Sequence, residues 1–280
     1  MVATVVGCYV LLAATLIGTG LAFTHFVSHS SVGHWDEHVN DWFAAHRTST
    51  WNRVSAGFSA LADTLGIVVV AALVTVVLLL RRWGKVALLL VIGLAVELSV
   101  FLSTTYLVAR PRPSAPHLGS TPSTFSWPSG HTAATLVLYG GIALLVMAAT
   151  PRRFPRVLAW VIALALTIGV AVSRVYRGEH HPTDTMAGVA LGIGALWAAV
   201  SAIRAGGRPL LKRAPRGHPT SDALPTSDAL PLPRPLPPLR APAGAVRQAQ
   251  PPPTGERRPA PPAPPSRSTE PASASARVRS

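Results

Sequence analysis

Residues 173–184 read Ser-Arg-Val-Tyr-Arg-Gly-Glu-His-His-Pro-Thr-Asp and stand between two strongly apolar segments of a 280-residue chain. Charged groups beside such segments are costly in a bilayer unless they have a chemical function. A second polar island, residues 109–131, contains Arg-Pro-Arg-Pro at 110–113 and Pro-Ser-Gly-His at 128–131, and apolar sequence flanks it too. The two islands predict a polar site at one surface of a helical membrane protein.

The composition is that of a membrane protein. Hydrophobic residues make up 49% of the chain and charged residues only 13%, against roughly 25% charged residues in a soluble domain. Six segments approach the roughly 20 apolar residues that a helix needs to cross a bilayer: 3–26, 61–80, 86–108, 132–149, 154–172 and 185–203. We therefore expect an all-α fold, a six-helix transmembrane bundle in residues 1–204 with its core in 61–203. The first helix is expected to be retained rather than cleaved.

Basic residues in the short loops predict how the spans are oriented. Arginine and lysine follow the second, fourth and sixth spans, at 81–85, 152–156 and 204–213. The positive-inside rule places these loops, and with them both chain ends, in the cytoplasm. Both polar islands then face outward from the plasma membrane, and their arginines break the charge rule. We attribute these outward arginines to an anionic ligand.

Two further segments have a recognisable character. Trp35, Val39, Trp42 and Phe43 recur at helical spacing, which predicts a short amphipathic helix at the outer interface. Residues 205–280 hold most of the 27 prolines and more than half of the formal net charge of +14. Such a segment cannot bury enough apolar surface to fold, so we expect a disordered, basic cytoplasmic tail.

The tail also bears on the choice of partners. Its basic side chains would be attracted to anionic lipid, and the proline-rich run at 231–238 could bind a polyproline-recognising partner. Because the positive charge is concentrated there, we do not expect the chain to bind nucleic acid. The expected partner of the spans and the tail is the bilayer.

The islands contain what hydrolysis of a phosphate ester requires: cations and donors around the phosphoryl oxygens, a nucleophile, and an acid for the leaving oxygen. Arg112 and Arg174 are the candidate cations, since a guanidinium group matches phosphate geometry. Ser129 is predicted to be the N-cap of the fourth span. In that place it would aim the free N–H groups of Gly130 and His131 at an anion.

Three side chains are candidates for the chemical steps. His180 and Asp184 are one helical turn apart, so the carboxylate could accept a hydrogen bond from one ring nitrogen and leave the other free to attack phosphorus. His131 could then protonate the leaving oxygen. The residues alone do not rank His180 above its neighbour His181.

In their order and spacing, these motifs resemble the three signature motifs of the type 2 phosphatidic acid phosphatase superfamily of membrane lipid phosphatases. The third motif is matched by Ser173, Arg174, His180 and Asp184, and the second by residues 128–131. The resemblance implies that His180 attacks phosphorus and forms a phosphohistidine, that Asp184 orients it, and that His131 is the general acid. It implies no metal and no other cofactor, and a phosphate-binding group made of Arg112, Arg174, Ser129 and Gly130.

The first motif is incomplete. In the family it reads Lys, six residues, Arg-Pro, and alignment on Arg112 and Pro113 leaves Thr105 in the place of the lysine. One phosphate-binding cation is therefore missing. Arg110 is the nearest replacement, and the Thr105 hydroxyl could donate one hydrogen bond to a phosphate.

Several functions stay open at this stage. The resemblance favours an undecaprenyl diphosphate phosphatase, with phosphatidate, phosphatidylglycerol phosphate or another polyprenyl phosphate as competing substrates. A non-catalytic lipid-phosphate-binding or scaffold protein would have lost turnover with the motif lysine. A metallohydrolase could use the histidines and Asp184, although the arginines would repel a cation. A transporter is disfavoured because the spans show no repeated halves.

Overall fold

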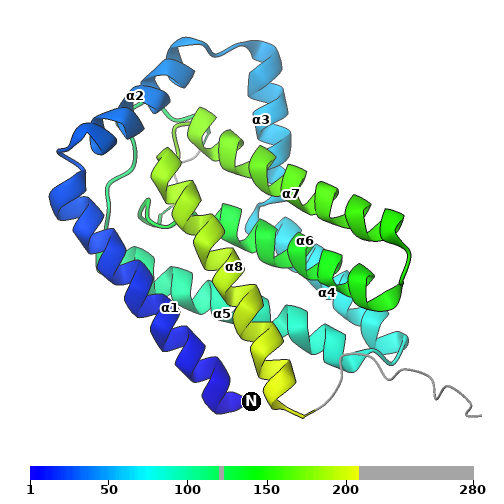
Figure 1. Ribbon diagram of the computed structural model, residues 1–280. Helices are drawn as coiled ribbons and strands as arrows, with labels where there is room; N and C mark the ends of the chain where they lie inside the picture. Colours follow the sequence, from blue (N-terminus) through cyan, green and yellow to red (C-terminus); the bar gives the residue numbers. More distant parts are fainter. Residues whose placement is uncertain (120–122, 208–280) are drawn as a thin grey trace, which may run out of the picture. The chain divides into compact units, whose positions relative to one another are not determined.

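The computed structural model describes residues 1–119 and 123–207, which form a bundle of helices (Figure 1). The prediction of an all-helical fold is confirmed, and the expected tail lies outside the described residues from 208 onward. In chain order the elements are α1 (Val2–Ala22), the π-helical turn η1 (Phe23–Val27), α2 (Ser31–Ala45), α3 (Ser49–Leu61), α4 (Thr64–Leu80), α5 (Gly84–Val108), α6 (Gly130–Ala149), α7 (Arg153–Tyr176) and α8 (Pro182–Ala205).

The helices account for five or six membrane spans. Five are long and apolar enough to cross a bilayer, namely α1 continued by η1, α5, α6, α7 and α8. The pair α3 and α4 meets the same criteria together but bends by 48° between the two helices. The expected second span corresponds to α4. The hydrophobic pattern did not predict α3, because its sequence mixes polar and apolar residues.

Close packing brings the starts of α6 and α8 together. α6 packs against α5, α7 and α8, while α1 packs against α5 and α8. Leu191 and Ala195 of α8 and Ala133 and Val137 of α6 are fully buried in this core. A Cβ at Gly188 would lie 2.5 Å from the carbonyl oxygen of the residue before α6, so glycine permits this approach.

The connections between helices gather at two ends of the bundle. At one end lie the start of α1, the α4–α5 and α6–α7 connections and the end of α8 (Figure 1). At the other end α5 and α7 finish while α6 and α8 begin, so both polar islands lie there. The predicted amphipathic helix is α2, which packs against η1, α7 and α8 near the islands. The basic loops and the polar islands therefore occupy opposite ends.

Candidate active site

The loop between α7 and α8 depends on a glycine. Gly178 has a φ of +75°, in the left-handed region that favours glycine. A Cβ there would also lie 2.9 Å from the carbonyl oxygen of Pro116, in the loop after α5. The turn therefore holds the 177–181 loop against the polar island at 109–131, so that the motifs from both islands meet.

His180 lies at the centre of this meeting point and is only 2% exposed. Its Nδ1 lies 2.7 Å from the carbonyl oxygen of Ser126 and 3.9 Å from Oδ2 of Asp184. A carbonyl oxygen can only accept, so Nδ1 carries the proton and Nε2 is the free nitrogen. The expected hydrogen bond from His180 to Asp184 is therefore replaced by one to the main chain.

The electrostatic surroundings keep this imidazole neutral. Burial, together with the nearby charges of Arg174 and Arg112, lowers the pKa of His180 to about 4, although Asp184 opposes the change. An unprotonated Nε2 is the form of histidine that can attack an electrophile. The site thus holds His180 ready to act as a nucleophile near neutral pH.

Asp184 lies 3.9 Å from the His180 ring, and three other donors make shorter contacts to its carboxylate. Arg110 Nη1 and Ser126 Oγ both donate to it, and the main-chain nitrogen of His181 lies 2.8 Å from Oδ2. His181 is the N-cap of α8, and Asp184 completes a capping box with it. The helix begins at Pro182, and proline is well suited to the first helical position.

The two residues considered as substitutes for the missing lysine have other partners. Arg110 is 4% exposed, and its guanidinium donates to Asp184, to Asp36 Oδ2 at 2.9 Å and to Thr183 Oγ1 at 2.9 Å. Thr105 is fully buried, and its hydroxyl donates to the carbonyl oxygen of Phe125 at 3.3 Å. These contacts do not match the expectation that either residue binds phosphate in place of the lysine.

The two candidate phosphate-binding arginines approach each other through Glu179. Arg112 donates to the carbonyl oxygen of Thr124 at 2.9 Å from Nη2 and to that of Glu179. Arg174 is 3% exposed, donates to Ser59 Oγ at 2.8 Å and pairs with the Glu179 carboxylate. Glu179 is itself buried, at 4% exposed. It supplies the counter-charge that a buried guanidinium needs.

The start of α6 completes the cluster. Ser129 is the N-cap of α6, as predicted, with Gly130 as the first helical residue. The Ser129 hydroxyl lies 3.0 Å from that of Thr132, and its main-chain nitrogen donates to the carbonyl oxygen of Asp184 at 2.9 Å. His131 is half-buried in the first turn of α6. The structure thus brings the candidate histidines and arginines together at one end of the bundle.

A helix outside the motifs contributes buried polar groups that the sequence reasoning missed. Asp36 and Asn40 of α2 are both fully buried, and Asn40 Nδ2 donates to the carbonyl oxygen of His180 at 3.1 Å. The available signal was their spacing of one helical turn on the face opposite Trp35 and Trp42. Ser126, which binds both His180 and Asp184, had no signal because its loop position gives no periodicity.

α2 also contacts the second histidine of the loop. Glu37 Oε1 lies 2.9 Å from Nε2 of His181, whose Nδ1 is 3.1 Å from Asp184 Oδ2. Burial lowers the pKa of His181, but its hydrogen bonds with the two carboxylates outweigh burial and raise the pKa above its ordinary value. Both ring nitrogens are engaged, so His181 is a structural residue in this arrangement. In the parts of the chain that the structure describes, no three His, Cys, Asp or Glu side chains form a group suited to a metal ion.

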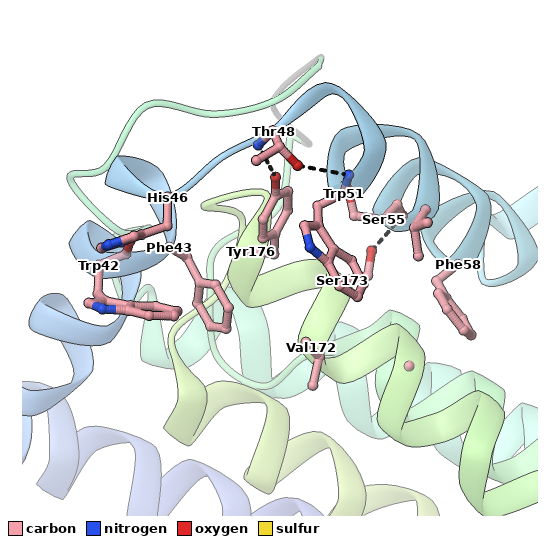
Figure 2. Close-up of a pocket in the computed structure, with 12 residues that line it drawn as sticks. Trp42, Phe43, His46, Thr48, Trp51, Ser55, Phe58, Val172, Ser173 and Tyr176 are labelled. Carbon is pink, nitrogen blue, oxygen red and sulfur yellow. Dashed lines mark hydrogen bonds between the residues drawn. The ribbon is translucent and has the colours of Figure 1, made fainter. Parts of the chain in front are cut away.

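An apolar cavity of about 580 Å³ lies beside the site, between α2–α3 and α7 (Figure 2). Aromatic side chains dominate its lining: Trp42, Phe43, Trp51, Phe58 and Tyr176. Ser173 lines it as well and donates to the carbonyl oxygen of Ser55 at 2.7 Å. The next residue, Arg174, contacts Ser59 one turn further along α3. The cavity and a candidate phosphate-binding arginine therefore share the contact between α3 and α7.

Comparison with known proteins agrees with this arrangement. Undecaprenyl-diphosphatase of Sulfolobus acidocaldarius is 31% identical over 120 residues, which is 41% of this chain and 54% of that protein. Phosphatidylglycerophosphatase B of Bacillus subtilis is 32% identical over 115 residues, 40% of this chain and 55% of that protein. Decaprenylphosphoryl-5-phosphoribose phosphatase of Mycobacterium tuberculosis is 37% identical over 89 residues, 31% and 44% of the two chains. The chain thus spans about half the length of the curated relatives it matches.

A solved structure shares the fold. The crystal structure of a transmembrane PAP2 type phosphatidylglycerolphosphate phosphatase from Bacillus subtilis superimposes with a TM-score of 0.57 at 22% identity, over 72% of this chain and 96% of that one. Residues 84–208 match the family model of the PAP2 superfamily, and this segment contains all three motifs. The chain is therefore a multi-pass membrane protein of the PAP2 superfamily.

Proposed function

We propose that the protein is a metal-independent lipid phosphatase, with undecaprenyl diphosphate as its first-choice substrate. The observation that carries the proposal is the state of His180, whose Nδ1–H is held by a main-chain carbonyl while Nε2 stays free beside Arg112 and Arg174. A neutral imidazole among fixed cations suits attack on a phosphoryl group.

The reaction proceeds in two steps. Nε2 of His180 attacks phosphorus, and the bond to the leaving oxygen breaks as His131 gives that oxygen its proton. The phosphorylated ring becomes a cation, which the carbonyl oxygen of Ser126 stabilises at Nδ1–H. Water then attacks the phosphohistidine with His131 acting as base. Arg112, Arg174 and the N–H groups after Ser129 hold the phosphoryl oxygens throughout.

Two observations support a lipid substrate. The relatives, by their names, act on an undecaprenyl diphosphate, a phosphatidylglycerophosphate and a decaprenylphosphoryl-5-phosphoribose, which share a phosphate attached to a lipid. The aromatic cavity between α2–α3 and α7 can receive an apolar tail beside Arg174. With a lipid diphosphate as substrate, the leaving group would be the lipid monophosphate.

We further propose that the site faces outward from the plasma membrane and that both chain ends are cytoplasmic. The basic loops lie at the end of the bundle opposite the site, which supports this orientation under the positive-inside rule. Residues 205–280 would then form a cytoplasmic tail, distinct from the membrane domain in 1–204.

The test is phosphate release from undecaprenyl diphosphate by the detergent-purified protein in EDTA, with phosphatidate as a second substrate. The expected result is release that disappears in His180→Ala and persists in His38→Ala, an exposed histidine on α2. His38→Ala should keep the thermal unfolding midpoint of the parent, and His180→Ala should remain folded with a midpoint lowered by the loss of a buried side chain. Release by His180→Ala at the parent rate would remove this residue from the nucleophile role.

Thr105 favours a second candidate, a lipid-phosphate-binding protein without turnover. Its hydroxyl is engaged with the carbonyl oxygen of Phe125, so this position supplies no cation to the site. The same assay separates the two functions. Binding of both lipids without phosphate release, together with release by Thr105→Lys, would establish the binding protein.

A further inference from the structure

α2 turns its polar face inward and its aromatic face outward. Its buried residues are Gly33, Asp36 and Asn40, whereas Trp35 and Trp42 are 47% and 50% exposed. A helix with this pattern needs polar partners inside the protein and an apolar or interfacial environment outside. The inward partners all belong to the site end of the bundle.

Asp36 makes the first of these contacts. Its carboxylate is fully buried, accepts from Arg110 Nη2 at 2.9 Å and from the main-chain nitrogen of Thr183 at 3.1 Å, and also accepts from the Thr183 hydroxyl. The other branch of the Arg110 guanidinium donates to Asp184. Asp36 therefore fixes the first turn of α8 both directly and through Arg110.

Asn40 makes the second contact, directly to the backbone of the nucleophile. Its Nδ2 donates to the carbonyl oxygen of His180 at 3.1 Å, while its buried Oδ1 has no hydrogen-bond partner in the described part of the chain. Leaving a buried acceptor unpaired costs free energy. The Asn40 amide thus makes a single side-chain hydrogen bond, to His180.

On the basis of the proposed function, we propose that Asp36 and Asn40 are positioning residues for His180, so that α2, which lies outside the family segment 84–208, is part of the catalytic apparatus. Ser126 holds the ring of His180 from one side and Asn40 holds its backbone from another. Asp36 binds Thr183, in the first turn of α8 after the loop. A nucleophile must lie within a fraction of an ångström of its productive position, so loosening either contact lowers turnover.

The test uses Asn40→Leu, which keeps the number and branching of the side-chain heavy atoms and removes both the donor and the unpaired acceptor. We expect kcat to fall by about 30-fold with KM within about twofold, because ground-state phosphate binding stays with the arginines. The thermal unfolding midpoint should stay close to that of the parent, since the variant removes one unpaired acceptor, Oδ1, and leaves another, the carbonyl oxygen of His180. The matched control is Asp41→Asn, an exposed neighbour on α2, which should behave as the parent. A kcat within threefold of the parent for Asn40→Leu would overturn the proposal.

A second variant and a binding measurement complete the test. Asp36→Asn keeps the shape but removes the charge that faces Arg110, and it should lower kcat by about tenfold or more without raising KM. Vanadate can adopt the five-coordinate geometry of the transition state, so the parent should prefer it over phosphate, and both variants should lose that preference by a similar factor. Equal affinity for the two anions in the parent would refute the proposed phosphatase itself. A preference kept in both variants would refute only the positioning role.

Discussion

Nδ1 of His180 lies 2.7 Å from the carbonyl oxygen of Ser126. The ring of the proposed nucleophile is therefore oriented by the main chain, and the Asp184 carboxylate lies further away, at 3.9 Å. Asp184 organises the groups around the ring by accepting from Arg110, from the Ser126 hydroxyl and from the nitrogen of His181. The carbonyl of Ser126 thus orients the ring, while the carboxylate of Asp184 organises the donors around it. In a direct histidine–carboxylate pair, one carboxylate would do both.

Ser126→Ala should therefore reduce activity without abolishing it. The substitution keeps the carbonyl that fixes the His180 tautomer but removes one donor from a buried carboxylate, which costs roughly 1–3 kcal/mol. We expect kcat to fall by about tenfold, measured as phosphate release at saturating substrate. Ser114→Ala, at an exposed loop serine that contacts Glu37, is the control. A loss as complete as that of His180→Ala would show that the hydroxyl itself is needed for the chemistry.

The pH dependence should follow the depressed pKa of His180, about 4. Because only the neutral ring attacks, kcat/KM should be retained as pH falls through the ordinary histidine value of about 6.5 and be lost toward pH 4. The buried, neutral His180 also contributes to the free energy of unfolding. This contribution is present above about pH 6.5 and is lost as pH falls toward 4, because the histidine of the unfolded chain is protonated at a higher pH than that of the folded chain. The measurement is kcat/KM between pH 4 and 8, corrected for the substrate's own ionisation by phosphorus NMR. An acid limb at or above pH 6.5 would contradict the buried, neutral nucleophile.

Glu179→Gln should destabilise the fold as well as the site. Arg174 and Glu179 are both nearly enclosed, and removal of the carboxylate leaves the guanidinium without its nearest counter-charge. Breaking such a buried pair typically costs about 3–5 kcal/mol. The readout is the thermal unfolding midpoint in detergent, with Arg53→Gln, at an exposed arginine on α3, as the comparison. Equal shifts for the two variants would mean that Glu179 acts as an ordinary surface charge.

The sequence predicted the fold through hydrophobic length, which is a local property. Long apolar runs in α1, α5, α6, α7 and α8 are sufficient to assign spans, and the positions of the islands between them follow. α3 was missed because Asn52, Arg53 and its serines break the apolar run that span prediction depends on. The bend between α3 and α4 depends on packing against α7 and α5, which no local pattern records.

The candidate site could be predicted as far as its motifs extend. Residue types and spacing brought His131, His180 and the two arginines forward, and the structure gathers them at one end of the bundle. The direction of each hydrogen bond could not be read from spacing: Asp184 is one turn from His180, yet its oxygens are taken by Arg110, Ser126 and His181. The contacts from α2 to His180 and Thr183 could not be predicted from local spacing, because they join positions 140 and 147 residues apart in the chain.

The aromatic cavity between α2–α3 and α7 should determine how the length of the lipid tail affects binding. Val172 lines it, whereas Ile168, one turn earlier on α7, is 61% exposed and does not. Val172→Trp should fill part of the space and raise KM for a long-chain substrate by about tenfold, roughly the loss of contact for one or two methylene groups. It should leave kcat, and the KM of a short-chain phosphate, nearly unchanged, because the arginines and histidines are not touched. Ile168→Trp adds bulk outside the cavity and should leave kcat and KM as in the parent, for both the long-chain and the short-chain substrate. If Val172→Trp raises KM equally for long and short substrates, the tail lies elsewhere and the cavity serves only to pack α2 and α3 against α7.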